Sequence, residues 1–357
     1  MIHSYSLNAP GRRVSSSRRL PGTMKLAGAL AGVLLVTAAC GSGSSGGGTT
    51  GGNVSGTTGL KGKTIDFVGY GKDNPWGAYF NGVFVPKLTS QGVKVVDLTT
   101  MDPGTAVTNL NQAISNKPDL IVAALLDTSS TVVPIKKAKQ AGIPVLVFDG
   151  RPDPSVDGDV MQVLSDSEAL GTAAAQNLVE GLKAQGRNSG NLIAITGTKS
   201  GFAAQDRMKG FNAELAKTPD YKVVDVQDGN WDPTLSSKIA TQLFAKYGCS
   251  GVQGAYGMAD YQALPIVAAA KQAGCPVGGK NGLIVTGSNC FKVGIDAIKA
   301  GTLYGTATED PGTIAEQTAD YVTRYFDKQN PPAKELVKEE RVTAKNVAQY
   351  AEQCSKA

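Results

Sequence analysis

The chemically capable side chains of this chain are carboxylates, amides and aromatic rings, because imidazole is almost absent from it. The only histidine among the 357 residues is His3. Every later segment therefore lacks the side chain needed for histidine acid–base catalysis, for a Ser-His-Asp triad or for a histidine-ligated metal. No C-x-x-C spacing indicates a metal site either. The sequence excludes these classes of catalytic and metal site.

Polar and aromatic side chains directly follow the apolar segments of the chain. Residues 71–82, GKDNPWGAYFNG, follow the first such segment and contain one of only two tryptophans. Ligands of open α/β sheets bind at the carboxyl ends of the strands. The positions to consider are therefore Tyr70 to Trp76, Asp127, Asp149 to Arg151, Asp166, Asp228 to Trp231, Asp260, Ser288, Asn289 and Glu309.

The elements that must hold these side chains alternate between apolar strands and amphipathic helices. We expect strands at 64–70, 94–100, 120–126, 144–149, 160–165, 191–197, 221–227, 251–257 and 282–287. Between them, segments such as 105–116 place apolar residues three and four positions apart, as the packed face of a helix does. This alternation predicts an α/β fold of parallel sheets covered on both faces. Nine or more strands divide more naturally into two sheets than into one.

The net charge of +5 comes entirely from the N-terminal leader. Five of the 35 basic residues lie in residues 1–39, which hold no acidic residue, so 30 basic and 30 acidic side chains remain in the rest of the chain. A neutral body gives no electrostatic surface for nucleic acid or anionic lipid. We therefore expect no nucleic-acid partner.

Residues 24–40, MKLAGALAGVLLVTAAC, have the form of an export signal. Their apolar run of about 14 residues is shorter than the roughly 20 residues that span a bilayer. The small residues before Cys40 and the Gly/Ser/Thr-rich segment after it resemble a bacterial lipoprotein signal. Cys40 would then carry a lipid and hold the protein at the outer face of the cytoplasmic membrane. The alternative is an ordinary secretory signal with an incidental cysteine, and translation could begin at Met1 or Met24.

The regions on either side of Cys40 follow from this interpretation. We expect residues 1–39 to be the signal peptide and residues 40–62 to be the lipidated cysteine with a flexible tether that has no fold of its own.

Four further cysteines, Cys249, Cys275, Cys290 and Cys354, form an even number in an exported chain. This number favours two disulfides, with three possible pairings, over free buried thiols.

Five segments occur in the order typical of one family of binding proteins. They are DNPWGAYFNG (73–82), the segment 118–149, SDSEALGTAAAQNLV (165–179), AAQDRMKGF (203–211) and VTGSN (285–289). Over residues 63–345 the chain resembles the type I periplasmic binding proteins, in particular the ribose- and xylose-type sugar-binding subunits of ABC transporters. Segment 118–149 is the most diagnostic, because its strand, Asp127, Pro134, lysine-rich helix and Gly-Ile-Pro-Val follow the family's order.

The resemblance implies two Rossmann-like lobes of parallel sheet joined by a three-crossing hinge, with a ligand cleft between them. The crossings would fall near residues 165–166, 309–310 and 337–341. Lobe 1 would then contain residues 63–165 and 310–340, and lobe 2 would contain residues 166–309 and 341–357.

The same resemblance implies the ligand contacts. Asn74 would bind a hydroxyl group and Trp76 would stack on the ligand ring, with Trp231 stacking from the opposite lobe. The other implied contacts are Asp149, Arg151, Arg207, Asp260, Asn289 and Glu309, and we add Tyr70 because it lies at the first strand end. Several positions depart from the family's pattern: Arg151 is one residue late, Asn289 stands for Asp, Glu309 stands for Gln, and Ala124 and Ala259 replace amides. The pocket should therefore be less polar than a ribose site.

Each of these residues also has a purely structural interpretation. The tryptophans could pack against a neighbouring helix or lobe, and Asp149 could cap a helix. Arg207 could form an ion pair with Asp206 or Glu214. We expect Asp127 to cap the helix that begins near Thr131, whereas Asp260 could either cap a helix or bind ligand. The shift of Arg151 could aim it out of the cleft.

The predicted fold also orders the cysteines. Cys249 and Cys275 each lie in a loop that leads into a strand of the second sheet, and those strands should be neighbours. We therefore expect the disulfide Cys249–Cys275, and Cys290–Cys354 by elimination.

The function that the resemblance implies is an exported, lipid-anchored solute-binding protein of an ABC importer. It would capture a monosaccharide or similar polyhydroxy solute by hinge closure and deliver it to a membrane permease, as a monomer, without a cofactor and without enzymatic activity. One alternative is a receptor that presents its ligand to a sensor or chemotaxis partner. Another is a binder of a non-sugar such as a nucleoside or a signalling furanone.

Overall fold

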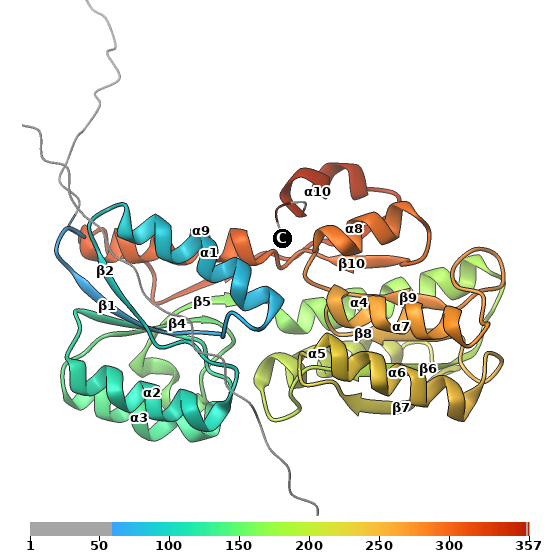
Figure 1. Cartoon of the computed structure of the whole chain (residues 1–357), viewed down its shortest axis with the longest axis horizontal. Helices are drawn as coiled ribbons and strands as arrows, with labels where there is room; N and C mark the ends of the chain where they lie inside the picture. Colours follow the sequence, from blue (N-terminus) through green and yellow to red (C-terminus); the bar gives the residue numbers. More distant parts are fainter. Residues whose placement is uncertain (1–58, 355, 357) are drawn as a thin grey trace, which may run out of the picture. The chain divides into compact units, whose positions relative to one another are not determined.

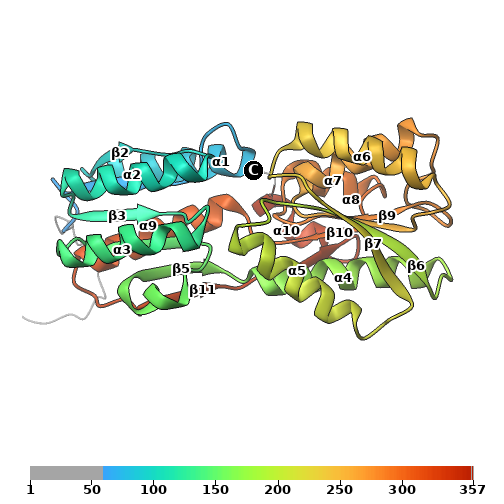
Figure 2. The ribbon, with the colours of Figure 1, turned by 90° about the horizontal axis from the view of Figure 1, so that it is seen from below.

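Two six-stranded sheets form the framework of the protein, in a computed structural model that describes residues 59–354 and 356. The first sheet has the strand order β11-β5-β4-β3-β1-β2, and the second has the order β12-β10-β9-β8-β6-β7. We call each sheet with its covering helices a lobe, lobe 1 and lobe 2 in that order (Figures 1 and 2). The expected signal peptide, the lipidated Cys40 and tether residues 41–58 lie outside the described residues.

Lobe 1 is built from the N-terminal part of the described chain and one later excursion. Its strands are β1 (Thr64–Val68), β2 (Lys94–Asp97), β3 (Leu120–Ala123), β4 (Val145–Asp149), β5 (Met161–Ser165) and β11 (Lys334–Val337). Its helices are α1 (Pro75–Thr89), α2 (Pro103–Asn116), α3 (Thr128–Gln140), the 3₁₀ helix η1 (Pro154–Asp159) and α9 (Pro311–Phe326).

Lobe 2 repeats this plan. Its strands are β6 (Gly190–Thr196), β7 (Tyr221–Asp228), β8 (Gly254–Gly257), β9 (Ile284–Thr286), β10 (Gly305–Ala307) and β12 (Arg341–Thr343). Its helices are α4 (Ser167–Ala184), α5 (Phe202–Leu215), α6 (Pro233–Tyr247), α7 (Asp260–Gln272), α8 (Lys292–Lys299) and α10 (Val347–Cys354). Among the helices of residues 59–354, none is long and apolar enough to cross a membrane.

The chain passes between the sheets three times. Strands β1 to β5 lie in the first sheet, β6 to β10 in the second, β11 in the first and β12 in the second. The crossings therefore fall after β5, between β10 and α9, and between β11 and β12. This confirms the predicted α/β class with two lobes and a three-crossing hinge. One pairing differs from the expected parallel sheets, because β12 runs antiparallel to β10.

Successive strand residues bury their side chains on opposite faces of each sheet, which explains the two helix layers per lobe. In lobe 1, Ile65 and Phe67 of β1 pack with α1 and α9, whereas Val68 packs with α2 and α3. In lobe 2, Leu192 and Ala194 of β6 pack with α4 and α5. Ile193 and Ile195 face α6, α7 and α8 on the other side. Figure 1 shows α1 and α9 on the opposite face of the first sheet from α2 and α3.

Six of the α-helices in the described residues begin at Asx residues, often with proline next. Asn74, Asp102, Asp127, Asp166, Asp232 and Asp310 each accept a hydrogen bond from a backbone N–H in the first turn of their helix. Such caps satisfy amides that a helix start leaves unpaired. Asp127 caps α3 as expected, with its side chain 3.0 Å from the Ser130 nitrogen, although α3 begins at Thr128 rather than near Thr131.

Other expectations about the elements are wrong in detail. Several predicted strands were too long at their C-terminal ends, because the chain leaves the ladder before the loop residues that face the pocket. Strands β10, β11 and β12 have only three or four residues each and were missed. The expected tether ends before Gly59, because Leu60 is fully buried in lobe 1 and the Gly59 amide donates to Asp327 at 2.7 Å.

Both disulfides have the expected partners. Cys249 bonds to Cys275, and Cys290 bonds to Cys354. The first joins the loops before β8 and β9 in lobe 2, while the second attaches α10 to the segment between β9 and α8.

Candidate functional site

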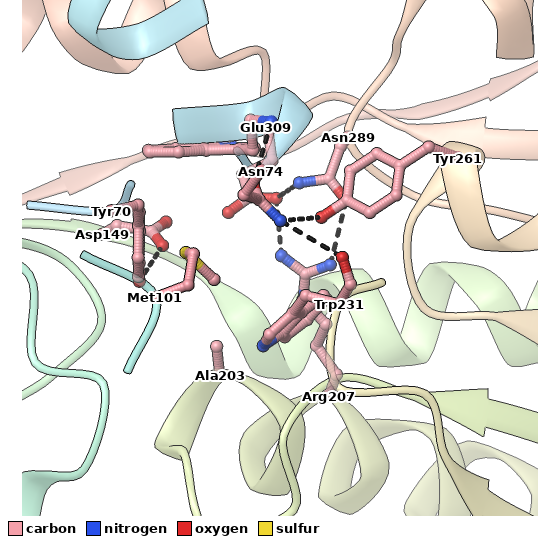
Figure 3. A pocket seen from close by; sticks show the side chains of 11 residues that line it. Tyr70, Asn74, Met101, Asp149, Ala203, Arg207, Trp231, Tyr261, Asn289 and Glu309 are labelled. Carbon is pink, nitrogen blue, oxygen red and sulfur yellow. Dashed lines mark hydrogen bonds and ion pairs between the residues drawn. The ribbon is translucent and has the colours of Figure 1, made fainter. Parts of the chain in front are cut away.

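A buried pocket is lined by both lobes and lies at the ends of their strands. The space between its lining side chains is about 330 Å³, part of it open to solvent. Lobe 1 contributes Tyr70, Asn74, Trp76, Met101 and Asp149; lobe 2 contributes Ala203, Arg207, Trp231, Tyr261 and Asn289; and Glu309 comes from the second crossing. Figure 3 shows these side chains converging from separate elements. Eight of them were among the ten predicted contacts.

Trp76 forms the aromatic wall of the pocket on the lobe 1 side. Its ring stacks on Phe80 at a centroid distance of 5.2 Å and meets the edge of Tyr70, also at 5.2 Å. Only 4% of Trp76 is exposed, and its Nε1 has no hydrogen-bond partner in the described structure. Both interpretations of this residue therefore apply at once, since the ring packs in the lobe 1 core and also lines the pocket.

Asn74 positions that wall. Its Oδ1 accepts hydrogen bonds from the backbone amides of Trp76 (2.9 Å) and Gly77 (3.1 Å), which fixes the start of α1. Its Nδ2 donates across to lobe 2, to the Trp231 carbonyl at 3.2 Å and the Tyr261 hydroxyl at 3.4 Å. At residue 77 a Cβ atom would lie 2.4 Å from the Gly71 carbonyl oxygen, so only glycine lets the Tyr70 loop pack this close to α1.

Trp231 forms an aromatic surface on the lobe 2 side. Its ring lies against Gly197, where a Cβ atom would come within 1.8 Å of the ring, so glycine is required there. The Arg207 guanidinium lies 5.1 Å from the ring centroid, within cation–π range. Trp231 therefore has a fixed place beside Arg207 rather than a free position in the loop.

Four pocket residues hold the left-handed backbone conformation that favours glycine. Their φ angles are 66° at Asp149, 56° at Trp231, 87° at Asn289 and 82° at Glu309. Each such residue costs about 1–3 kcal/mol, and such strain concentrates at functional sites. Such a cluster of strained residues in one pocket is typical of a functional site.

A charged network forms the floor of the pocket. Arg207, 2% exposed, donates to the Met258 carbonyl at 2.6 Å, to Asn289 Oδ1 at 3.1 Å and to Glu309 Oε2 at 2.5 Å. Asn289 Nδ2 donates to the same Glu309 oxygen. The expected alternative, an ion pair with Asp206 or Glu214, is wrong. Arg207 Nε has no partner in the described structure, which leaves one buried donor on a pocket residue.

A second carboxylate adjoins this network. Asp149 accepts hydrogen bonds from the Tyr70 hydroxyl and the Ser165 hydroxyl, both at 2.8 Å, and so does not cap a helix. Burial raises the pKa of Glu309 well above its ordinary value; Arg207 lowers that pKa, and the hydrogen-bonded Asp149 raises it further. Two acidic groups therefore line the pocket together with one guanidinium, which is paired with Glu309.

Two predicted contacts lie elsewhere. Arg151 points to Asp206 in lobe 2 and is not part of the pocket wall, which is the second of the two positions left open for it. Asp260 is fully buried and accepts from the Phe291 amide and the Thr306 hydroxyl, both at 2.8 Å. It neither caps α7, whose N-cap is Ala259, nor lines the pocket. Instead it holds the loop that carries Asn289.

Three lining residues were missed from the sequence. Tyr261 is adjacent to the predicted Asp260, and Met101 follows the second strand. A search that included a few more residues after each strand would have found both. Ala203 carries no chemical signal. Glu339, in the third crossing, was also missed; burial raises its pKa to about 8, and it accepts a hydrogen bond from Thr308 at 3.0 Å.

Two parallel-sheet lobes joined by three crossings, with a pocket lined from both, define a two-lobed binding protein. Residues 65–330 match the family model of the periplasmic binding protein domain, and the chain belongs to this family. The resemblance drawn from the sequence is therefore confirmed.

Named relatives are similar to this chain in sequence at low identity. A xylitol-binding protein of Mycolicibacterium smegmatis is 25% identical over 214 residues, 60% of this chain and 57% of the relative. A D-apiose import binding protein of Actinobacillus succinogenes is 26% identical over 219 residues, 61% of this chain and 66% of the relative. The chain thus spans less than two thirds of either relative. The crystal structure of a galactofuranose binding protein has the same fold, with a TM-score of 0.73, 19% identity and coverage of 82% of this chain and 98% of that one.

Proposed function

We propose that this protein is the solute-binding subunit of an ABC importer and that it captures a monosaccharide or polyol by closing its lobes. The observation that carries the proposal is one buried pocket in which Trp76 and Trp231 flank the Arg207–Glu309 network. A sugar ring offers apolar C–H faces to aromatic rings and a hydroxyl rim to charged partners. Two buried donors without protein partners, Trp76 Nε1 and Arg207 Nε, suit ligand oxygens.

The charge of the pocket favours a neutral ligand. Its lining contains two carboxyl groups, Asp149 and Glu309, and a single cation, Arg207, whose terminal nitrogens already bind protein oxygens. A sugar acid or phosphate would enter beside the carboxyl groups without a free cation to balance it. The solutes named for the relatives, xylitol, D-apiose and galactofuranose, are uncharged polyhydroxy compounds.

The rest of the proposal concerns the whole chain. We assign residues 63–165 and 310–340 to the first lobe, with residues 59–62 packed against it, and residues 166–309 and 341–357 to the second. The protein would be exported, act as a monomer without catalytic conversion, and deliver its solute to a membrane permease. Cys40 would carry the lipid anchor, and loss of detergent-phase partitioning in a Cys40→Ser variant tests this.

A ligand screen tests the central claim. Thermal shifts would be measured with xylitol, D-ribose, D-apiose, D-galactose, their aldonic acids where available, and nucleosides. Ligand at 100 times its Kd stabilises the protein by about 2.7 kcal/mol, which is readily detected. We expect a neutral sugar or polyol to give the largest shift, and Trp76→Ala to weaken its affinity at least tenfold in calorimetry. Binding of nucleosides alone, or a change under twofold in the variant, would contradict the proposal.

A further inference from the structure

Arg151 joins the two lobes outside the ligand pocket. It follows β4 in lobe 1, and its guanidinium reaches α5 of lobe 2, where Nε and a terminal nitrogen donate to the two oxygens of Asp206 at 2.7 and 3.0 Å. The same guanidinium lies 3.7 Å from the ring centroid of Phe202, also on α5. None of these three residues lines the pocket.

The geometry of this contact makes it stronger than an ordinary surface ion pair. Both oxygens of the carboxylate are engaged, and the planar cation also stacks on an aromatic ring, which are the arrangements that distinguish Arg from Lys. The two charged side chains are 38% and 18% exposed, so solvent screens them only in part. We infer that Arg151, Asp206 and Phe202 form an interlobe clasp that sets the balance between the closed and open lobes, without contacting the ligand.

Helix α5 couples the clasp to the pocket. Asp206 and Arg207 are consecutive, so their side chains leave the helix about 100° apart. Arg207 points inward to Glu309, while Asp206 points to Arg151. Closing the cleft therefore forms the clasp on the same rigid helix that carries Arg207 into the pocket. Ligand affinity depends on the closed population, so a residue that never touches ligand can still set affinity.

A distance measurement tests the clasp without any ligand. Nitroxide labels would be attached through p-acetylphenylalanine at the exposed Lys136 of α3 and Lys238 of α6, which leaves the cysteines unmodified. In pulsed electron spin resonance on the full chain, Arg151→Ala should raise the ratio of the longer, open distance to the closed one about tenfold. Arg151→Lys should give an intermediate ratio, because lysine keeps the positive charge but cannot form the paired hydrogen bonds to Asp206 or stack on Phe202 as the planar guanidinium does.

Two further variants distinguish a clasp from damage to the fold. Lys209→Ala removes a charge from the same helix and breaks the Lys209–Glu168 ion pair within lobe 2 but no hydrogen bond between the lobes, so the distances should change little. The charge swap Arg151→Asp with Asp206→Arg should return most of the population to the closed distance. An Arg151→Ala distribution that matches wild type, or a swap that restores nothing, would overturn the inference.

Affinity provides a second readout that rests on the proposed function. Calorimetry with xylitol and D-ribose should show about tenfold weaker binding for Arg151→Ala and recovery in the swap. If wild type binds neither solute while the distances respond as expected, the clasp stands and the proposed ligand class fails. If wild type binds and Arg151→Ala binds equally well, the clasp is overturned.

Discussion

Glu309 is the residue whose chemistry depends most on closure of the cleft. In the structure it lies buried between Arg207 and Asp149, and burial raises its pKa well above the ordinary value. When the lobes separate, water reaches the carboxyl group and the pKa should return toward that ordinary value of 4.5. Glu309 therefore holds a proton more tightly in the closed form than in the open form. A neutral Glu309 can donate a hydrogen bond to Asp149, as the amide of glutamine could.

This difference makes ligand binding depend on pH with a definite sign. Because the closed form binds more protons than the open form, closure and therefore affinity should weaken as pH rises above the ordinary carboxyl range. The loss of ligand affinity can approach tenfold per pH unit. Glu309→Gln should remove the pH dependence and keep affinity at pH 6 within about threefold. Calorimetry of the best-binding solute between pH 5 and 8 would measure both.

A matched control separates this effect from general titration. Glu316 of α9 is exposed, and Glu316→Gln should leave the pH profile of binding unchanged. A wild-type affinity that is constant from pH 5 to 8, or a Glu309→Gln profile as steep as wild type, would show that Glu309 does not titrate with closure.

At the residue scale, strand-end position was enough to predict most of the pocket. Asp149 and Asn289 directly follow apolar segments, and parallel strands bring such positions to one edge. The roles of Arg151 and Asp260 could not be predicted, because both depend on which lobe or loop lies opposite. The one-residue shift of Arg151 places it against α5 of lobe 2. Asp260 accepts a hydrogen bond from the Thr306 hydroxyl, and Thr306 lies in β10, a strand that the sequence did not predict.

At the scale of elements, the sequence predicted the long strands and their helices but not the short elements of the hinge. Hydrophobic periodicity needs several residues to be visible, whereas β10 and β12 have three each. The antiparallel pairing of β12 with β10 is fixed by the third crossing rather than by residue pattern. The burial of Leu60 likewise depends on a distant element, since Gly59 binds Asp327 just after α9.

The disulfide Cys290–Cys354 links one of these short elements to the pocket. Cys290 follows Asn289 directly, and both have positive φ angles, of 54° and 87°. Cys354 ends α10, a helix of eight residues that would be marginal on its own. The bond therefore fixes α10 and the Asn289 loop together. In the other disulfide, Cys249–Cys275, neither cysteine is next to a pocket residue in the sequence.

We expect the two disulfides to differ in their effect on binding. In the chain-entropy account, loops of 64 and 26 residues each contribute about 3–4 kcal/mol to stability. Cys290→Ser with Cys354→Ser should therefore lower the melting temperature and also weaken solute binding about three- to tenfold. Cys249→Ser with Cys275→Ser should lower the melting temperature alone. Equal affinity in both double variants would show that α10 does not position Asn289.

At the scale of the whole molecule, titrating carboxyl groups fall into two sets with opposite effects on stability. Burial raises the pKa of Asp260 to about 7 and that of Glu339 to about 8. Elsewhere, although burial opposes the shift, Lys345 and Arg341 lower the pKa of Glu180 to about 2. The first set lies in the lobe 2 core and hinge, whereas Glu180 lies on the lobe 2 surface.

The two sets predict maximum stability near pH 5. Below pH 4, groups such as Glu180 gain protons more readily in the unfolded chain, so stability falls as pH falls. Between pH 4.5 and 8 the folded protein keeps the proton on Glu339 that the unfolded chain has released. In this range the folded state binds more protons than the unfolded state, so stability falls as pH rises. The stabilising contribution of Glu339 is lost by about pH 8. The loss from pH 5 to 8 should be on the order of a few kcal/mol.

Urea unfolding monitored by circular dichroism, without oxidant or reductant so that both disulfides stay intact, measures this trend. The urea midpoint should be higher at pH 5 than at pH 8. Glu339→Gln keeps the neutral form at every pH, so it should flatten the decline between pH 6 and 8. The neighbouring Glu340→Gln should retain the wild-type slope, because no buried carboxyl group is changed. A wild-type midpoint that rises from pH 5 to 8 would show that paired surface carboxylates, rather than the buried hinge acids, govern the stability of this protein.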